Sequence, residues 1–379
     1  MLDSARTFWQ PEIIREIITI LARYGFNRFH WHLTDDAGWR INIPGYPELT
    51  RVGAFLPREP FEWYDNIDPD KRCAIITSAP EDSSFGFYSD DEIRGIVDHA
   101  QSLGIEVIPE IDLPGHMHAA IRSYPHFGDP ALADLPPDQW NHRNDLVWPS
   151  DETWRFIETT LTHVASLFPS PIIHIGGDEC RFEAWEADSD LMKSLATRGI
   201  HSGHQLQADM TRRALECLHT LDKRAAGWDE LTEITPTEDL EDTLIIAWRG
   251  FGEGPRIAAV SGQPWVYGCC DQLYLNRLAG PADKEPAAMY GIITVERILT
   301  EVMEEITKAP SEPMGIQAAL WCEFVPTREQ LYYQLFPRLL AVAEIAWHGL
   351  EAYDEAALSE RIRSEMAWLA SQGMRGRGA

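Results

Sequence analysis

Two adjacent carboxylates at the end of an apolar run are the residues of this chain best placed to do chemistry. Residues 172–180 read Ile-Ile-His-Ile-Gly-Gly-Asp-Glu-Cys, so Asp178 and Glu179 directly follow two glycines. A regular strand would point neighbouring side chains to opposite faces, but glycine permits a bend that brings them together. Two carboxyl groups held close do not ionise together easily, so one can keep its proton and serve as a general acid. A strand-end loop with two solvated acids is the alternative interpretation.

Polar and aromatic side chains also follow the other apolar runs. Tryptophan recurs there beside an acid or an arginine. A flat indole packs against the apolar face of a sugar, while carboxylates and arginine orient its hydroxyl groups, so this combination predicts a carbohydrate site. The residues concerned are Asp3, Arg6, His30, Trp31, His32, Asp35, Asp36, Glu110, Asp112, His116, Trp228, Asp229, Glu230, Trp248, Arg249, Tyr274, Trp321, Cys322 and Glu323.

Other kinds of catalytic site have weaker support in the sequence. His30 and His32 alternate and could share a metal, but the later strand ends supply tryptophan and acids without a second histidine pair. We therefore expect no catalytic metal and no cofactor. The chain has no GxSxG elbow for a serine nucleophile, and no GxGxxG or Walker loop for a nucleotide.

Apolar runs and helical patterns alternate along the chain. The runs that predict strands cover residues 1–5, 26–33, 105–110, 172–176, 224–228, 243–248, 264–267 and 315–321. Helical spacing is clear at 12–24, 89–103, 152–168 and 204–221. Eight strands separated by helices predict an α/β fold, a closed (β/α)₈ TIM barrel, with a doubly wound sheet as the alternative.

Three segments are too long for ordinary connections between a strand and a helix: 34–88, 117–150 and 268–294. Each follows a strand, so in a barrel each lies on the catalytic face at the carboxyl ends of the strands. No repeat or linker divides the chain. We expect a catalytic barrel over residues 1–350, with 351–379 forming a C-terminal helix, near 354–371, and a tail packed on the barrel.

The composition limits the possible partners. The 379 residues are 44% hydrophobic and carry a formal charge of −28, which argues against nucleic acid and anionic membranes. No apolar run approaches the roughly 18 residues of a membrane helix. Six cysteines without a CxxC pair indicate neither a zinc site nor a disulfide framework. The first residues lack a signal-peptide pattern, so the localisation stays open between cytoplasmic and secreted. The oligomeric state stays open between monomer and homodimer.

Together these segments closely resemble the catalytic barrel of the β-N-acetylhexosaminidases, family 20 of the glycoside hydrolases. The similarity follows the family's order from residue 2 to about 347. It rests on Leu2-Asp3-Ser4-Ala5-Arg6, Phe29-His30-Trp31-His32-Leu33-Thr34-Asp35-Asp36-Ala37-Gly38-Trp39-Arg40, Glu110-Ile111-Asp112-Leu113-Pro114-Gly115-His116, His174-Ile175-Gly176-Gly177-Asp178-Glu179, Trp228-Asp229-Glu230, Tyr274-Leu275 and Leu320-Trp321-Cys322-Glu323.

The resemblance implies an exo-acting enzyme that removes terminal β-linked GlcNAc or GalNAc through an oxazolinium intermediate, in which the substrate supplies its own nucleophile. It implies that Glu179 is the general acid and base, while Asp178 and Tyr274 orient the 2-acetamido group. It also implies a supporting Asp35–His116 pair beside Glu179. The implied substrate-binding residues are Arg6, Trp228, Trp248, Trp321, Glu323, Asn276 and Arg277. A non-hydrolytic sugar-binding protein on the same barrel is the alternative, although it would have no need of this full set.

Two departures from the family pattern carry their own expectations. The family's barrel commonly follows a small α+β domain, whereas this chain begins inside the first strand, so we expect a truncated start or the absence of that domain. Asn276 and Arg277 stand where many members have Asp-Leu. In this respect the chain is similar to a mammalian lysosomal member that accepts 6-sulfated GlcNAc, which predicts tolerance of a 6-sulfate.

Overall fold

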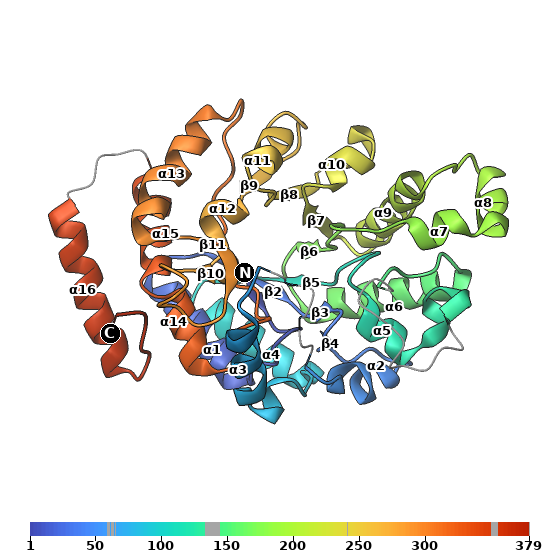
Figure 1. Cartoon of the computed structure of the whole chain (residues 1–379). Helices are drawn as coiled ribbons and strands as arrows, with labels where there is room; N and C mark the ends of the chain where they lie inside the picture. Colours follow the sequence, from blue (N-terminus) through green and yellow to red (C-terminus); the bar gives the residue numbers. More distant parts are fainter. Residues whose placement is uncertain are drawn as a thin grey trace.

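The computed structural model describes residues 1–58, 61, 64, 66–132, 145–240, 242–349 and 355–378. Parallel strands gather at its centre, with helices around them (Figure 1). Seven strands pair in the order β1-β2-β5-β6-β7-β8-β9, and every pair is parallel. They are β1 (Leu2–Asp3), β2 (Arg28–His32), β5 (Glu106–Glu110), β6 (Ile172–His174), β7 (Arg224–Trp228), β8 (Leu244–Ala247) and β9 (Trp265–Tyr267).

The eighth strand, predicted at residues 315–321, is an irregular segment that closes the sheet into a barrel. Ile316 bridges to Tyr267 in β9, and Leu320 bridges to Leu2 in β1, both in parallel. The amide of Asp3 donates to the carbonyl of Leu320 at 3.1 Å. The predicted barrel is therefore confirmed, with isolated bridges in place of a regular last strand.

Helices follow the strands and cover the outside of the barrel. Helices α1 (Pro11–Arg23), α4 (Asp90–Ser102), α6 (Asp151–Leu167) and α9 (Gly203–Thr220) lie where helical spacing predicts them. The side chains of Ser89, Ser150 and Ser202 accept from backbone amides in the first turns of α4, α6 and α9, which fixes where these helices start. The other helices are α2 (Glu48–Arg51), α3 (Pro69–Ser78), α5 (His118–Ser123), α7 (Glu183–Ala187), α8 (Ser189–Ala196), α10 (Leu231–Ile234), α11 (Glu253–Ala258), α12 (Cys270–Leu273), α13 (Val295–Lys308), α14 (Arg328–Leu335), α15 (Arg338–His348) and α16 (Glu355–Ser371).

The three long segments start at the carboxyl ends of β2, β5 and β9, as predicted, and carry short elements of their own. The first holds the antiparallel pair of β3 (Thr34–Asp35) and β4 (Gly38–Trp39). The third holds β10 (Arg277–Leu278) and β11 (Met289–Ile292), which pair in parallel. Part of the second, residues 133–144, lies outside the described residues.

The C-terminal helix α16 lies at the outer edge of the molecule (Figure 1). It is attached by ion pairs between Arg361 and Glu344 of α15, and between Glu365 and Arg23 of α1 at 3.0 Å. Leu369 adds a buried apolar contact. Among the described residues, none of the helices combines the length and the apolar composition needed to cross a bilayer.

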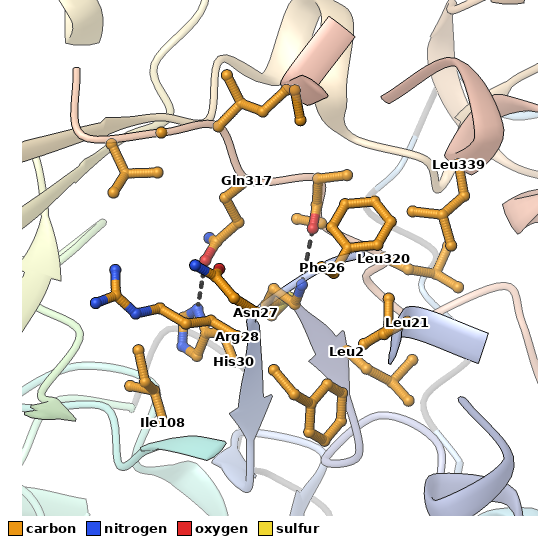
Figure 2. Close-up of a pocket in the computed structure, with 18 of the residues that line it drawn as sticks. Leu2, Leu21, Phe26, Asn27, Arg28, His30, Ile108, Gln317, Leu320 and Leu339 are labelled. Carbon is orange, nitrogen blue, oxygen red and sulfur yellow. Dashed lines mark hydrogen bonds between the residues drawn. The ribbon is translucent and has the colours of Figure 1, made fainter. Parts of the chain in front are cut away.

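The amino ends of the strands enclose a cavity of about 340 Å³ (Figure 2). Its wall is largely apolar and includes Leu2, Phe26 and Leu320. Gln317 and His30 form a hydrogen bond of 3.2 Å across it. None of the described residues that line it is an aspartate or glutamate, so the predicted chemistry belongs to the other end of the barrel.

Candidate active site

The carboxyl ends of the strands open into a cavity of about 850 Å³. With one exception, the residues predicted for the site line this cavity. They come from the ends of different strands and from the long third segment. They are Arg6, Asp35, His116, Asp178, Glu179, Trp248, Tyr274, Asn276, Arg277, Trp321 and Glu323; the exception, Trp228, is buried.

Asp178 and Glu179 lie on a tight turn after β6. Gly176 and Gly177 have φ of 65° and 101°, and a Cβ on Gly176 would come within 1.7 Å of Asp112 Oδ1. Both positions therefore require glycine. The φ of Glu179 is also positive, at 49°. As a result, the side chain of Asp178 is only 12% exposed, whereas that of Glu179 is 57% exposed and faces the cavity.

His116 lies between two pairs of acids. Its Nε2 is 3.7 Å from both Asp178 Oδ2 and Glu179 Oε2. Its Nδ1 is 3.2 Å from Asp36 Oδ2 and 3.6 Å from Asp35 Oδ1. Burial alone would lower the pKa of His116, but the charge of Asp35 and hydrogen bonds to both aspartates raise it well above its usual value. His116 is therefore a cation next to Glu179.

Asp35 is held as a carboxylate. Burial alone would raise its pKa, but the charges of Arg6 and His116 hold that pKa well below its usual range. Arg6 Nη2 lies 2.8 Å from Asp35 Oδ2, and His32 Nε2 lies 2.9 Å from the same oxygen. Its negative charge thus lies next to Arg6, His32 and His116 and favours the protonated form of His116.

The pKa of Asp178 is shifted in the opposite direction from that of Asp35. Burial, together with the neighbouring carboxyl groups of Asp112 and Glu179, raises the pKa of Asp178 well above its usual value. Burial also raises the pKa of Asp112 to about 7, and its Oδ1 accepts from the Gly177 amide at 3.2 Å. Asp178 Oδ1 has no hydrogen-bond partner among the described residues. A ligand N–H placed there would favour the charged form of Asp178.

Aromatic side chains wall the cavity. The rings of Trp248 and Tyr274 stack at 6.0 Å, and those of Tyr274 and Trp321 lie 6.1 Å apart. Trp228 packs against Trp321 at 5.8 Å. The indole N–H of Trp248 donates to Glu230 at 2.9 Å, which fixes the orientation of that ring. Burial raises the pKa of Tyr274 well above its usual value, so its hydroxyl keeps its proton and can donate it in a hydrogen bond.

Polar atoms also face the cavity without internal partners. Asn276 Oδ1 and Glu323 Oε2 are buried and have no hydrogen-bond partner among the described residues. Burial raises the pKa of Glu323 to about 7, although Arg6 acts in the other direction. The guanidinium of Arg6 lies 5.0 Å from the centre of the Trp321 ring. These groups are available to hydroxyl groups of a ligand.

Arg277, in contrast, already has partners. Its Nη1 donates to Asp271 Oδ1 at 3.1 Å, and its Nη2 lies 3.1 Å from Cys270 Sγ. The ring centre of Tyr290 is 5.9 Å from its guanidinium. The positive charge of Arg277 is therefore balanced by the carboxylate of Asp271.

Inside the barrel, three histidines surround Glu110. His30 and His32 of β2 and His174 of β6 contact its carboxylate at 3.0, 2.5 and 3.0 Å. The two histidines of β2 differ in charge, because burial lowers the pKa of His30 to about 4, whereas the charge of Glu110 raises the pKa of His32 well above its usual value although burial opposes this. Three groups of described residues bring donor atoms within 4.8 Å of one another and could geometrically hold an ion: His30, Glu110 and His174; Asp35, Asp36 and His116; Asp112, His116 and Asp178.

The chain matches the family described as "Glycosyl hydrolase family 20, catalytic domain" over residues 1–350. It belongs to this family. A beta-hexosaminidase from Porphyromonas gingivalis is 33% identical to this family 20 chain, over 99% of the chain and 46% of that protein. A beta-hexosaminidase from Vibrio furnissii is 34% identical, over 90% of the chain and 55% of that protein.

The fold agrees with this assignment. A family 20 exo β-N-acetylglucosaminidase from Vibrio harveyi, solved in complex with N-acetylglucosamine, matches with a TM-score of 0.82 and 30% identity. The match covers all of this chain and 58% of that one. The chain thus spans about half the length of the relatives it matches.

Some residues of the cavity escaped the sequence analysis. Asp112 was noted at a strand end but not assigned to the site, and Asp36 adjoins a residue that was assigned. Glu230, also at a strand end, does not line the cavity itself but accepts from the indole N–H of Trp248, which does. Phe251 and Tyr290 line the cavity from loops that have no periodic pattern. The signal for Asp112, Glu230 and Asp36 was their position after a strand. No comparable signal marks Phe251 and Tyr290.

Proposed function

We propose that this chain is the catalytic barrel of an exo-acting β-N-acetylhexosaminidase that removes terminal non-reducing β-linked GlcNAc or GalNAc. The observation that supports this most is the pair of unlike acids, Asp178 and Glu179, in a cavity walled by Tyr274 and tryptophan. The names of the two bacterial relatives and the GlcNAc complex of the Vibrio harveyi enzyme point to the same substrate. Residues 1–350 would form the catalytic unit, with 351–379 supporting it from outside.

The proposed reaction is a substrate-assisted hydrolysis with retention. Glu179 protonates the glycosidic oxygen while the 2-acetamido oxygen attacks the anomeric carbon, so the leaving alcohol departs and an oxazolinium ion forms. Asp178 accepts a hydrogen bond from the acetamido N–H, and Tyr274 donates one to the acetamido oxygen, which fixes the attacking geometry. Glu179 then removes a proton from the water that opens the intermediate.

The electrostatics of the site suit these roles. After Glu179 gives up its proton, the adjacent His116 cation stabilises the carboxylate that remains. Asp178 is desolvated, and the acetamido N–H would supply the hydrogen bond that its unpartnered oxygen lacks. A glucoside without the acetamido group brings neither this N–H nor the nucleophile.

The remaining residues would hold the terminal sugar. Trp228, Trp248 and Trp321 would enclose the acetamido methyl, while Arg6 and Glu323 would bind the ring hydroxyl groups. Asn276 would face the 6-position. Because Asn276 is neutral and the Arg277–Asp271 pair is close by, we further propose that a 6-sulfate is tolerated rather than required.

The decisive experiment is hydrolysis of 4-nitrophenyl N-acetyl-β-glucosaminide followed by NMR. The β-anomer should appear first, activity should survive a chelator, and Asp178→Ala should lower kcat/KM by at least about 10²-fold. Glu179→Gln should lose less on substrates with activated leaving groups, which do not need the acid. Glu12→Gln, an exposed acid of α1, is the control. The α-anomer as first product, or strong turnover of a β-glucoside, would exclude this mechanism, and GlcNAc binding without hydrolysis would favour a sugar-binding protein.

A further inference from the structure

A buried glutamate in the third long segment joins three other parts of the chain. Glu285 lies between β10 and β11 and is almost fully buried. Its Oε1 accepts from Arg377 Nε at 2.7 Å, and its Oε2 accepts from the hydroxyl of Tyr333 in α14 at 2.8 Å. Its backbone carbonyl accepts from Lys71 Nζ of α3 at 2.6 Å. Both carboxylate oxygens are thus engaged, which fixes one orientation of the Glu285 side chain.

Arg377 belongs to the tail that follows α16, far from Glu285 in the sequence. The tail runs along the turn between α14 and α15, where the amide of Arg377 donates to the carbonyl of Phe336 at 2.9 Å. A Cβ on Gly376 would lie 2.6 Å from Phe336 Cβ, and one on Gly280 would lie 2.5 Å from Arg377 Nη2. Glycine permits both close approaches, so the guanidinium of Arg377 lies directly on the loop between β10 and β11.

The same loop connects residues of the active-site cavity. Asn276 and Arg277 precede Glu285 in the sequence, Met289 and Tyr290 follow it, and all four of these neighbours line the cavity. The amide of Met289 donates to the carbonyl of Asn276 at 3.0 Å, which joins the two sides of the loop. A shift of the loop would therefore move this part of the cavity wall as a unit.

The ends of the loop and its middle are held by different residues. Buried Arg338 of α15 donates to three backbone carbonyls, at 2.6, 2.9 and 3.3 Å, which belong to Leu275, Arg277 and Ile293. These contacts hold the loop at both of its ends. Between them the chain extends to Glu285, so the position of the middle of the loop depends on the tail.

Stability alone does not explain a charged pair at this place. Replacing a buried ion pair with apolar residues is often neutral or stabilising, whereas an ion pair also specifies one geometry. Apolar packing of Ala287 with Ile75 of α3 and with Phe324 already attaches the loop to its surroundings. The pair of Arg377 and Glu285 is therefore suited to aligning the loop.

We propose that Arg377 and Glu285 are positioning residues, through which the C-terminal tail sets the geometry of the pocket for the 6-hydroxyl group of the sugar. This inference rests on the proposed function, in which Asn276 faces the 6-position. Neither positioning residue is among the described residues that line the cavity, so both act through the loop. With the pair in place, the unpartnered Oδ1 of buried Asn276 accepts from the 6-hydroxyl group. Without the pair, the loop shifts and this hydrogen bond weakens.

The kinetic test compares 4-nitrophenyl N-acetyl-β-glucosaminide with its 6-deoxy analogue. Arg377→Ala should lower the ratio of kcat/KM for the hydroxylated substrate to that for the deoxy analogue about 3- to 10-fold, as expected for the loss of one hydrogen bond. A smaller folded fraction would lower both values equally and leave the ratio unchanged. Arg377→Lys keeps a cation beside Glu285 and should retain most of the ratio. Glu285→Gln, which leaves no unpaired charge in the interior, should lower the ratio in the same direction as Arg377→Ala.

Arg361→Ala is the matched control, because it breaks an ion pair of the same C-terminal segment, between α16 and Glu344 of α15. It should leave the ratio unchanged. Hydrogen exchange should become faster in residues 279–288 in Arg377→Ala and not in Arg361→Ala. An unchanged ratio in Arg377→Ala, whatever the exchange shows, would overturn the inference, and so would an equal loss in the control or an unmutated protein that does not distinguish the two substrates.

A binding measurement separates this inference from the proposed reaction. Calorimetry gives the affinity for GlcNAc relative to 6-deoxy-GlcNAc without any turnover, and Arg377→Ala should lower that ratio by a similar factor. A lowered affinity ratio in a protein that hydrolyses neither substrate would support the role of the tail and overturn the proposed hydrolysis. Unchanged kinetic and affinity ratios in an active enzyme would overturn the role of the tail alone.

Discussion

Asp178 and Glu179 are neighbours in the sequence, yet their surroundings give them different chemistry. Asp178 is buried beside Asp112, and its pKa is raised. Glu179 is turned by its left-handed backbone toward the cavity, where it lies 3.7 Å from the His116 cation. The same functional group can therefore orient an amide in one position and transfer a proton in the next.

The proposed tolerance of a 6-sulfate can be tested at one residue. Asn276→Asp places a carboxylate near the 6-position, and repulsion should lower the ratio of kcat/KM for 4-nitrophenyl GlcNAc-6-sulfate to that for the unsulfated substrate by about tenfold or more. Adding Arg277→Leu should lower the ratio further, although it also removes the partner of Asp271. Equal losses on both substrates, or an unmutated protein inactive on the sulfated one, would contradict the proposal.

At the scale of the elements, the sequence locates the strands well because a buried parallel strand is a continuous apolar run that ends at a polar residue. The run at 224–228 coincides with β7, and that at 105–110 exceeds β5 by one residue. Because the carboxyl ends of parallel strands meet on one face, residues directly after the strands could be predicted to share a cavity. Glu179, His116, Trp248 and Glu323 do so.

What escaped prediction depends on contacts between loops. The nearness of Asp36 to His116 depends on the short β3–β4 pair, which has no length over which a period could appear. Asp271 accepts from the backbone N–H of Phe251 and from Arg277, whose guanidinium lies 5.9 Å from the ring centre of Tyr290. A single sequence gives no signal for such contacts, since each loop is aperiodic on its own.

A further prediction concerns Glu110, which lies inside the barrel. Glu110 of β5 faces histidines of β2 and β6, and their charges lower its pKa well below its usual value although burial opposes this. Glu110→Gln would leave buried positive charge unpaired and should lower the free energy of unfolding at pH 7 by about 3–5 kcal/mol, measured by urea denaturation. The loss should shrink as the pH falls below the usual carboxyl pKa of 4.5, because the unfolded chain then binds a proton at Glu110 that the native state does not bind. Glu12→Gln should change stability by no more than about 0.5 kcal/mol; equal effects would contradict this assignment.

For the whole molecule, the formal charge of −28 reflects 60 acidic residues against 32 lysines and arginines. Several of them line or adjoin one cavity, and burial raises the pKa of Asp112 to about 7, of Glu323 to about 7 and of Glu230 to about 9. Near neutral pH, the native site therefore binds protons that the unfolded chain would release. Its contribution to stability must then depend on pH.

Glu230 gives the clearest case, because its pKa of about 9 lies far above its usual 4.5. Between these values the native state binds a proton that the unfolded state does not, so the contribution of Glu230 is complete below pH 4.5 and is lost as the pH rises toward 9. Glu230→Gln removes this titration while its amide oxygen can still accept from the Trp248 indole. Relative to the unmutated protein, the variant should gain free energy of unfolding as the pH rises from 6 to 8, by up to about 1.4 kcal/mol per pH unit. Urea denaturation at pH 6, 7 and 8 measures this difference, with Glu12→Gln as the exposed control; a constant difference between variant and unmutated protein would show that Glu230 is ionised in the native site throughout this range.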